Sequence, residues 1–110
     1  MQSEKEINEL AKKYLVYSTA KSAVQKQREI NRTTKLEITY IVINEWLDVT
    51  IRTIRILKEG TSELSFKKET DGISISYKQN GWQREHSIKR KEIVKEAERT
   101  IKKIGEKIAV

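Results

Sequence analysis

Cysteine and proline are absent from this chain of 110 residues, which holds one histidine and four glycines. The absence of cysteine excludes disulfides, thiolate nucleophiles and cysteine-ligated zinc, and it favours a cytoplasmic setting over an oxidising compartment. A lone histidine excludes most catalytic triads and metal sites. The glycines are too far apart to form a phosphate-cradling loop, since they stand at Gly60, Gly72, Gly81 and Gly105. We therefore expect no enzymatic activity, no catalytic or metal-binding residues and no cofactor.

Long apolar runs are also missing. No stretch approaches the roughly 20 residues that a membrane-spanning helix needs, and the segment Met1–Glu6 lacks the apolar core of a signal peptide. Apolar residues make up 36% of the chain and charged residues 35%, against about 45–50% and about 25% in typical soluble domains. We expect a single cytoplasmic domain over residues 1–110, without membrane contact, whose thin core favours assembly with a second copy.

The N-terminal segment predicts a helix. Ser3 and Glu6 have the spacing of a capping box, in which both side chains satisfy free backbone donors at a helix start. Asn31 marks its end. Apolar residues follow helical spacing in two stripes that need two partners: Ile7, Leu10, Ala11, Tyr14 and Leu15 in the first, and Val16, Ala20, Ala23, Gln27 and Ile30 in the second. We assign the second stripe to a homodimer interface. The weak helix formers at 16–19 leave open a break there instead.

Two strands are predicted next. Apolar residues alternate with a period of two over 36–43. After a turn at 44–45, the segment 46–57 is rich in β-branched residues, and its apolar phase changes at a bulge near Arg52 or Thr53. The same segment as a helix would align Leu47, Ile51 and Ile54, so for 46–57 the helical alternative stays open.

Two hairpins are marked by Asp71-Gly72 and Asn80-Gly81, because both dipeptides favour two-residue turns with positive φ. They join strands at 64–68, 73–77 and 82–86. Two-residue loops predict four facing pairs: Thr70 with Ile73, Phe66 with Tyr77, Tyr77 with Arg84, and Ile75 with His86. One face then becomes the core side by collecting Leu64, Phe66, Ile73, Ile75, Tyr77 and Trp82.

A final helix is predicted after Ser87, a good N-cap. Its apolar seam repeats at alternating spacings of three and four: Val94, Ala97, Ile101, Ile104 and Ile108. The chain as a whole therefore predicts an α+β domain, with an N-terminal helix, an antiparallel β-meander of four or five strands and a C-terminal helix packed on the sheet.

Two groups of side chains are candidates for chemistry. The predicted register places Tyr77, Arg84 and His86 on one face, where such groups can move a 2′-hydroxyl proton in metal-independent ribonucleases. We favour the simpler interpretation of a tyrosine, a cation and a ring at the edge of the core, with Arg84 stacked on Tyr77. Carboxylates suited to magnesium are also present, without metal-specific spacing, at Glu37, Glu45 and Asp48.

Positive charge concentrates at the two ends of the chain, which carries a net charge of +7. Lys and Arg outnumber Asp and Glu by eight to four in residues 1–35 and by nine to five in residues 84–110, whereas residues 36–83 hold six against seven. In the final helix, cations recur every four residues, a spacing that weakens an isolated helix. They are Lys91, Lys95, Arg99, Lys103 and Lys107.

This ladder of cations has two interpretations. Glu92, Glu96 and Glu98 can reach Lys95, Arg99 and Lys102, respectively, which would make the ladder a solvated, salt-bridged face. Cations also crowd the helix start, where the helix dipole is already positive. A bound phosphate would relieve both features by accepting backbone donors and pairing with several cations.

We therefore predict a small basic protein that binds nucleic acid, DNA or RNA, through phosphates with little sequence specificity, as a homodimer. The alternative is a protein-interaction module, an inhibitor or assembly factor that binds an acidic protein partner. The predicted nucleic-acid contacts are Arg84, Ser87, Lys89, Arg90, Lys91, Lys95 and Arg99.

Overall fold

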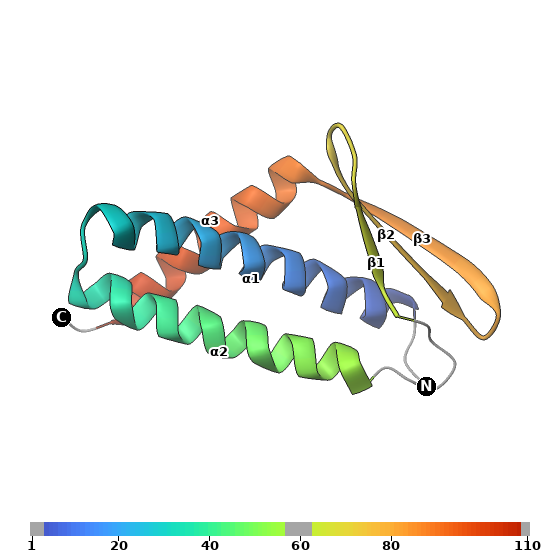
Figure 1. Ribbon diagram of the computed structural model, residues 1–110, viewed down its shortest axis with the longest axis horizontal. Helices are drawn as coiled ribbons and strands as arrows, with labels where there is room; N and C mark the ends of the chain where they lie inside the picture. Colours follow the sequence, from blue (N-terminus) through green and yellow to red (C-terminus); the bar gives the residue numbers. More distant parts are fainter. Residues whose placement is uncertain (1–3, 57–62, 109–110) are drawn as a thin grey trace.

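The computed structural model describes residues 4–56 and 63–108. Its elements follow the order α1 (Glu4–Ile30), α2 (Thr34–Ile56), β1 (Ser65–Lys68), β2 (Gly72–Gln79), β3 (Trp82–Lys89) and α3 (Arg90–Lys107) (Figure 1). The α+β class is confirmed. The element count differs, because two helices precede a sheet of three strands, where the sequence predicts one helix and four or five strands. No helix in these described ranges is long and apolar enough to cross a membrane.

Helix α1 runs unbroken through 16–19 and is the central element of the fold. It lies along α2 on one side and against α3 on another (Figure 1). Because it is covered from two directions, its buried residues spread around the axis: Ile7, Ala11, Leu15, Val16, Ala20 and Val24. The prediction of one helix with two partners is confirmed, and the alternative of a break is wrong. The Ser3 half of the predicted capping box lies outside the described residues.

The second stripe of α1 is not free for a second subunit. Val16 and Ala20 are buried inside the chain itself, at 5% and 0% exposure. Gln27 and Ile30, at the end of the stripe, are less covered, and Ile30 is exposed. The predicted homodimer interface is thus wrong for Val16 and Ala20, which pack inside the chain.

Helix α2 replaces both strands predicted over 36–57. Its buried residues recur at spacings of three and four, which is a helical pattern: Thr39, Ile43, Leu47 and Thr50. The helical alternative is confirmed over residues 46–56, and residue 57 lies outside the described residues. The alternation over 36–43 is misleading because both sides of α2 carry apolar residues, so a period of two also fits.

The β-branched residues of α2 disfavour a helix only weakly, and their polar members are satisfied inside it. The hydroxyls of Thr39, Thr50 and Thr53 each donate a hydrogen bond of 2.8 Å to the carbonyl four residues earlier. Packing against α1 outweighs the remaining propensity cost, which is a few tenths of a kcal/mol per residue.

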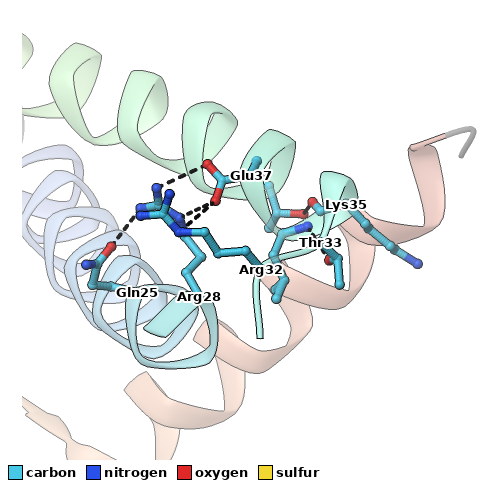
Figure 2. Close-up of polar contacts among 8 residues, drawn as sticks. Gln25, Arg28, Arg32, Thr33, Lys35 and Glu37 are labelled. Carbon is cyan, nitrogen blue, oxygen red and sulfur yellow. Dashed lines mark hydrogen bonds and ion pairs between the residues drawn. The ribbon is translucent and has the colours of Figure 1, made fainter. Parts of the chain in front are cut away.

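A polar cluster joins the end of α1 to the start of α2 (Figure 2). The Arg28 guanidinium donates two hydrogen bonds to the Glu37 carboxylate, at 3.0 and 3.1 Å, and a third to Gln25 Oε1 at 2.7 Å. It also lies 4.1 Å from the centre of the Tyr40 ring. Thr33 caps α2 by accepting the Leu36 N–H at 3.2 Å. These contacts fix the angle of the α1–α2 connection.

The sheet has the order β1-β2-β3 and is antiparallel throughout. The Asn80-Gly81 turn has positive φ at both residues, 52° and 84°, as the two-residue hairpin requires. The predicted pairs Tyr77 with Arg84 and Ile75 with His86 are both confirmed.

The first hairpin differs from its prediction by two residues. Lys68, not Thr70, faces Ile73, so Phe66 faces Ile75. The loop therefore comprises residues 69–71, and it is closed by a hydrogen bond of 2.8 Å from the Glu69 N–H to the Gly72 carbonyl at the start of β2. A shift of two keeps every side chain on its predicted face.

The core face of the sheet covers the N-terminal half of α1. Ile75 and Tyr77 are buried, and the Phe66 ring packs 5.2 Å from that of Tyr14. Trp82 is 71% exposed, so its predicted place in the core is wrong. It lies beside the hairpin turn, at the end of the sheet.

Helix α3 starts later than predicted. The β2–β3 ladder continues as far as Lys89, opposite Gly72, so Ser87 pairs with Ser74 in the sheet and is not an N-cap. Of the predicted seam, Ala97 and Ile104 are buried and Ile101 and Ile108 are partly buried, whereas Ile93 takes the place expected for Val94. The helix packs chiefly along α1, and less on the sheet than predicted (Figure 1).

Two isoleucines of α2 test its helical assignment. Ile43 is fully buried and Ile41 is 56% exposed. In a helix, side chains two positions apart point about 200° away from each other around the axis. We expect Ile43→Ala to lower the free energy of unfolding by about 2–5 kcal/mol, and Ile41→Ala to change it by less than about 0.5 kcal/mol, in chemical denaturation. Equal costs would indicate a strand, in which both residues share a face.

Candidate nucleic-acid interface

Five of the seven predicted contact residues lie together at the start of α3. Lys89 is the last residue of β3, and Arg90 and Lys91 are the first two of α3. Lys95 and Arg99 follow at successive turns, and all five side chains are exposed. Four of these cations line a surface groove together with residues of the β1–β2 loop and of α3; its lining residues are Thr70, Asp71, Lys89, Arg90, Lys91, Val94, Lys95 and Glu98.

Arg84 lies apart from this group, whereas Ser87 lies at its edge, beside Lys89 and the β1–β2 loop. Arg84 precedes Lys89 by five strand residues, a distance of about 16 Å, and an odd separation puts the two side chains on opposite faces of the sheet. Arg84 instead approaches Glu4 of α1, at 3.8 Å. Ser87 shares a face with Lys89, and its hydroxyl contacts Glu69 Oε1 at 3.4 Å.

Two of the three acids predicted to neutralise the ladder pair with another helix instead. Lys12, on α1, donates a hydrogen bond of 2.6 Å to Glu92 and lies 3.1 Å from Glu96. The hydrogen bond from Lys12 lowers the pKa of Glu92, and the same contact raises the pKa of Lys12. Glu92 and Glu96 thus serve to hold α3 against α1.

The outer cations of α3 are left without acidic partners. Within the described ranges, no ion pair joins an acid to Lys91, Lys95 or Arg99. The predicted ion pair between Glu98 and Lys102 is not formed there either. Their spacing of four residues advances about 6 Å along the helix and about 40° around it per step. The first three cations therefore face away from the side buried against α1, where Ala97 and Ile104 lie.

The start of α3 is capped by the β1–β2 loop. Its N-cap residue, Lys89, makes no side-chain capping hydrogen bond. The Arg90 N–H donates to the Asp71 carbonyl at 2.8 Å. This bond satisfies one of the free donors at the helix start and positions the loop beside the cations.

Tyr77 and His86, two of the residues considered for acid-base chemistry, lie in positions that do not form a catalytic site. Tyr77 is buried, its hydroxyl donates to Asn8 Oδ1 at 3.2 Å, and burial raises its pKa. His86 is exposed on the next strand. A phenol with a raised pKa stays protonated near neutral pH, so this geometry does not favour proton abstraction by Tyr77.

The acids weighed for magnesium do not converge. Glu37 is held by Arg28, and the described residues contain no group of three His, Asp or Glu side chains that could bind a metal ion.

Lys12 is the residue of this region that sequence reasoning missed. It stands 80 residues from Glu92 in the chain, and a lysine on a helix facing solvent looks the same in sequence as one that bridges two helices. Only the packing of α3 along α1 reveals its role.

Comparisons with known proteins identify no relative. No protein-family model matches the chain, and neither the search of curated proteins nor that of solved structures found a match. The functional argument therefore depends on the geometry of this chain alone.

The Lys12 bridge has a measurable signature in the pKa of Glu92. In an NMR titration, we expect the pKa of Glu92 to lie below its ordinary value of 4.5. In the variant Lys12→Ala, the pKa of Glu92 should rise most of the way back to that ordinary value. The lowered pKa contributes stability that is present above the ordinary value and lost as the pH falls through the folded-state value. An unchanged Glu92 pKa in Lys12→Ala would mean that the bridge does not form in solution.

Proposed function

We propose that this protein binds nucleic acid through its phosphates, with little sequence specificity, and acts as a homodimer. The binding residues form what we call the α3 cation surface: Lys89, Arg90, Lys91, Lys95 and Arg99. No catalytic step is part of the proposal.

The observation that carries the proposal is the unneutralised ladder on α3. Each pair of like charges four residues apart costs an isolated helix about 0.2–0.5 kcal/mol. Two of the three acids able to offset this cost, Glu92 and Glu96, are paired with Lys12, and the third, Glu98, forms no ion pair within the described residues. The fold gains nothing from keeping Lys91, Lys95 and Arg99 next to one another. A polyanion would turn the same arrangement from a cost into a binding surface.

The composition of the surface favours phosphate contact over base recognition. Its side chains are Lys and Arg on an exposed helix face, which pair with phosphates whatever the sequence. A second copy of the chain presents the surface twice, so two weak contacts combine on one strand or duplex.

Removing three of these cations should weaken binding to every sequence alike. We expect the triple variant Lys91→Ala, Lys95→Ala and Arg99→Ala to lower affinity for duplex DNA, duplex RNA or single strands at low salt. The dependence of log affinity on log salt should flatten by about 0.7–0.9 for each lost contact, or about 2–3 in total. Fluorescence anisotropy over a salt series measures both quantities.

The matched control removes three exposed cations elsewhere, as Lys13→Ala, Lys26→Ala and Lys68→Ala. Both triple variants lose three of the seven net positive charges, so a difference between them reports position and not total charge. Equal losses would reduce the interaction to general attraction of a basic protein. Absence of wild-type binding at low salt would reject nucleic acid and favour an acidic protein partner.

Lys12→Ala should weaken nucleic-acid binding although Lys12 is not part of the α3 cation surface. Once released, Glu92 and Glu96 can pair with Lys95 and Arg99, which lie three residues further along α3. We expect affinity to fall about three- to fivefold further than in Lys13→Ala, which removes the same charge from the neighbouring position. The same anisotropy assay applies, and identical losses in both variants would show that the freed acids leave the cations available.

A further inference from the structure

The outer face of α2 carries an apolar seam that the other residues of the ranges 4–56 and 63–108 leave largely uncovered. Six residues, spaced alternately by four and three, lie on the side of α2 away from the buried Ile43: Ile38, Val42, Glu45, Val49, Arg52 and Ile56. Val49 is 56% and Ile56 77% exposed, while Val42 is half-buried at the edge of the seam. This is the spacing of a coiled-coil contact, on the helix that forms one long edge of the molecule (Figure 1).

Two opposite charges interrupt the seam one heptad apart. Glu45 and Arg52 lie on the same face as the apolar residues, and neither forms an ion pair within the part of the chain that the structure describes. A partner that covers the seam must therefore offer a cation near Glu45 and an anion near Arg52.

We propose that a second copy of this chain docks on the seam, with the two α2 helices antiparallel. The seam is symmetric about position 47, so a two-fold axis there superimposes it on itself. Ile38 then meets Ile56 of the second copy, and Glu45 meets Val49.

The antiparallel arrangement also matches the charges. Glu45 and Arg52 of the second copy are offset by three residues along the axis, or about 4.5 Å, which long side chains span. The symmetry forms this ion pair twice. A parallel pair in register would instead place Glu45 against Glu45 and Arg52 against Arg52, which is repulsive.

This interface is separate from the stripe of α1 that the sequence suggested, and it shares no residue with the α3 cation surface. It specifies how the homodimer of the proposed function assembles, but it does not require nucleic acid. The two proposals can fail independently. Dimerisation through the seam is tested by the oligomeric state, whereas nucleic-acid binding is tested by affinity.

Charge reversal tests the proposed pairing. In sedimentation equilibrium up to about 100 µM, we expect wild-type dimers, and a dissociation constant at least about tenfold higher for Glu45→Arg and for Arg52→Glu, since each variant puts like charges together twice. Circular dichroism checks that the exposed substitutions leave the fold intact. The double variant, with both reversals in one chain, should recover dimerisation.

Mixing the two single variants gives a sharper result. In a heterodimer, the arginine introduced at position 45 of one chain would face the glutamate introduced at position 52 of the other. The unchanged Arg52 of the first chain would face the unchanged Glu45 of the second, so both pairs are again complementary. We expect an equimolar mixture to dimerise although each variant alone does not. A mixture that stays monomeric overturns the pairing.

Cysteine cross-linking separates antiparallel from parallel docking, and the chain contains no other cysteine. Residues 38 and 56 lie about 27 Å apart along one helix, too far for an internal disulfide. We expect the variant with Ile38→Cys and Ile56→Cys to form a covalent dimer on mild oxidation, whereas Ile38→Cys alone stays reduced. Cross-linking by Ile38→Cys alone, or a wild type that remains monomeric at about 100 µM, overturns the proposal.

Discussion

The burial of α1 is the constraint on which the rest of the structure depends. The other elements meet mainly through this helix, since α2 and α3 each pack along it and the sheet rests on its N-terminal half. Ala11 and Ala20 are fully buried, and their small side chains let neighbouring backbones approach closely. With 36% apolar residues in the whole chain, there is little other surface from which to build a core.

The same packing decides how charge is distributed over the surface. Because α3 packs against α1, Lys12 comes within reach of Glu92 and Glu96, and these two acids pair with α1 while they remain partly exposed. The cations that alternate with them point outward. A single inter-helix bridge at the surface thus occupies two acids of α3 and leaves the neighbouring cations without them, which no contact within α3 alone would produce.

Local signals in the sequence were sufficient where structure is decided locally, and they failed where packing decides it. The Asn80-Gly81 turn and the pairing of Tyr77 with Arg84 follow from turn chemistry and a period of two. The sequence left a helix open only for the second half of α2 and predicted a strand for the first half, because β-branched residues favour strands until a neighbouring helix offers a surface to cover. The candidate site was found in part. Its cations are evident from their spacing, but the role of Lys12 depends on a contact across 80 residues.

The hydrogen bond from the Arg90 N–H to the Asp71 carbonyl gives the β1–β2 loop a second task. Hairpin loops normally tolerate insertions and deletions because little depends on their path. Here the loop at 69–71 also sets the point at which α3 begins, so a change in its length would move the first cations relative to the sheet. We expect this loop to keep its length during evolution while its outward-facing side chains vary, so that its conservation would be one of shape and not of sequence.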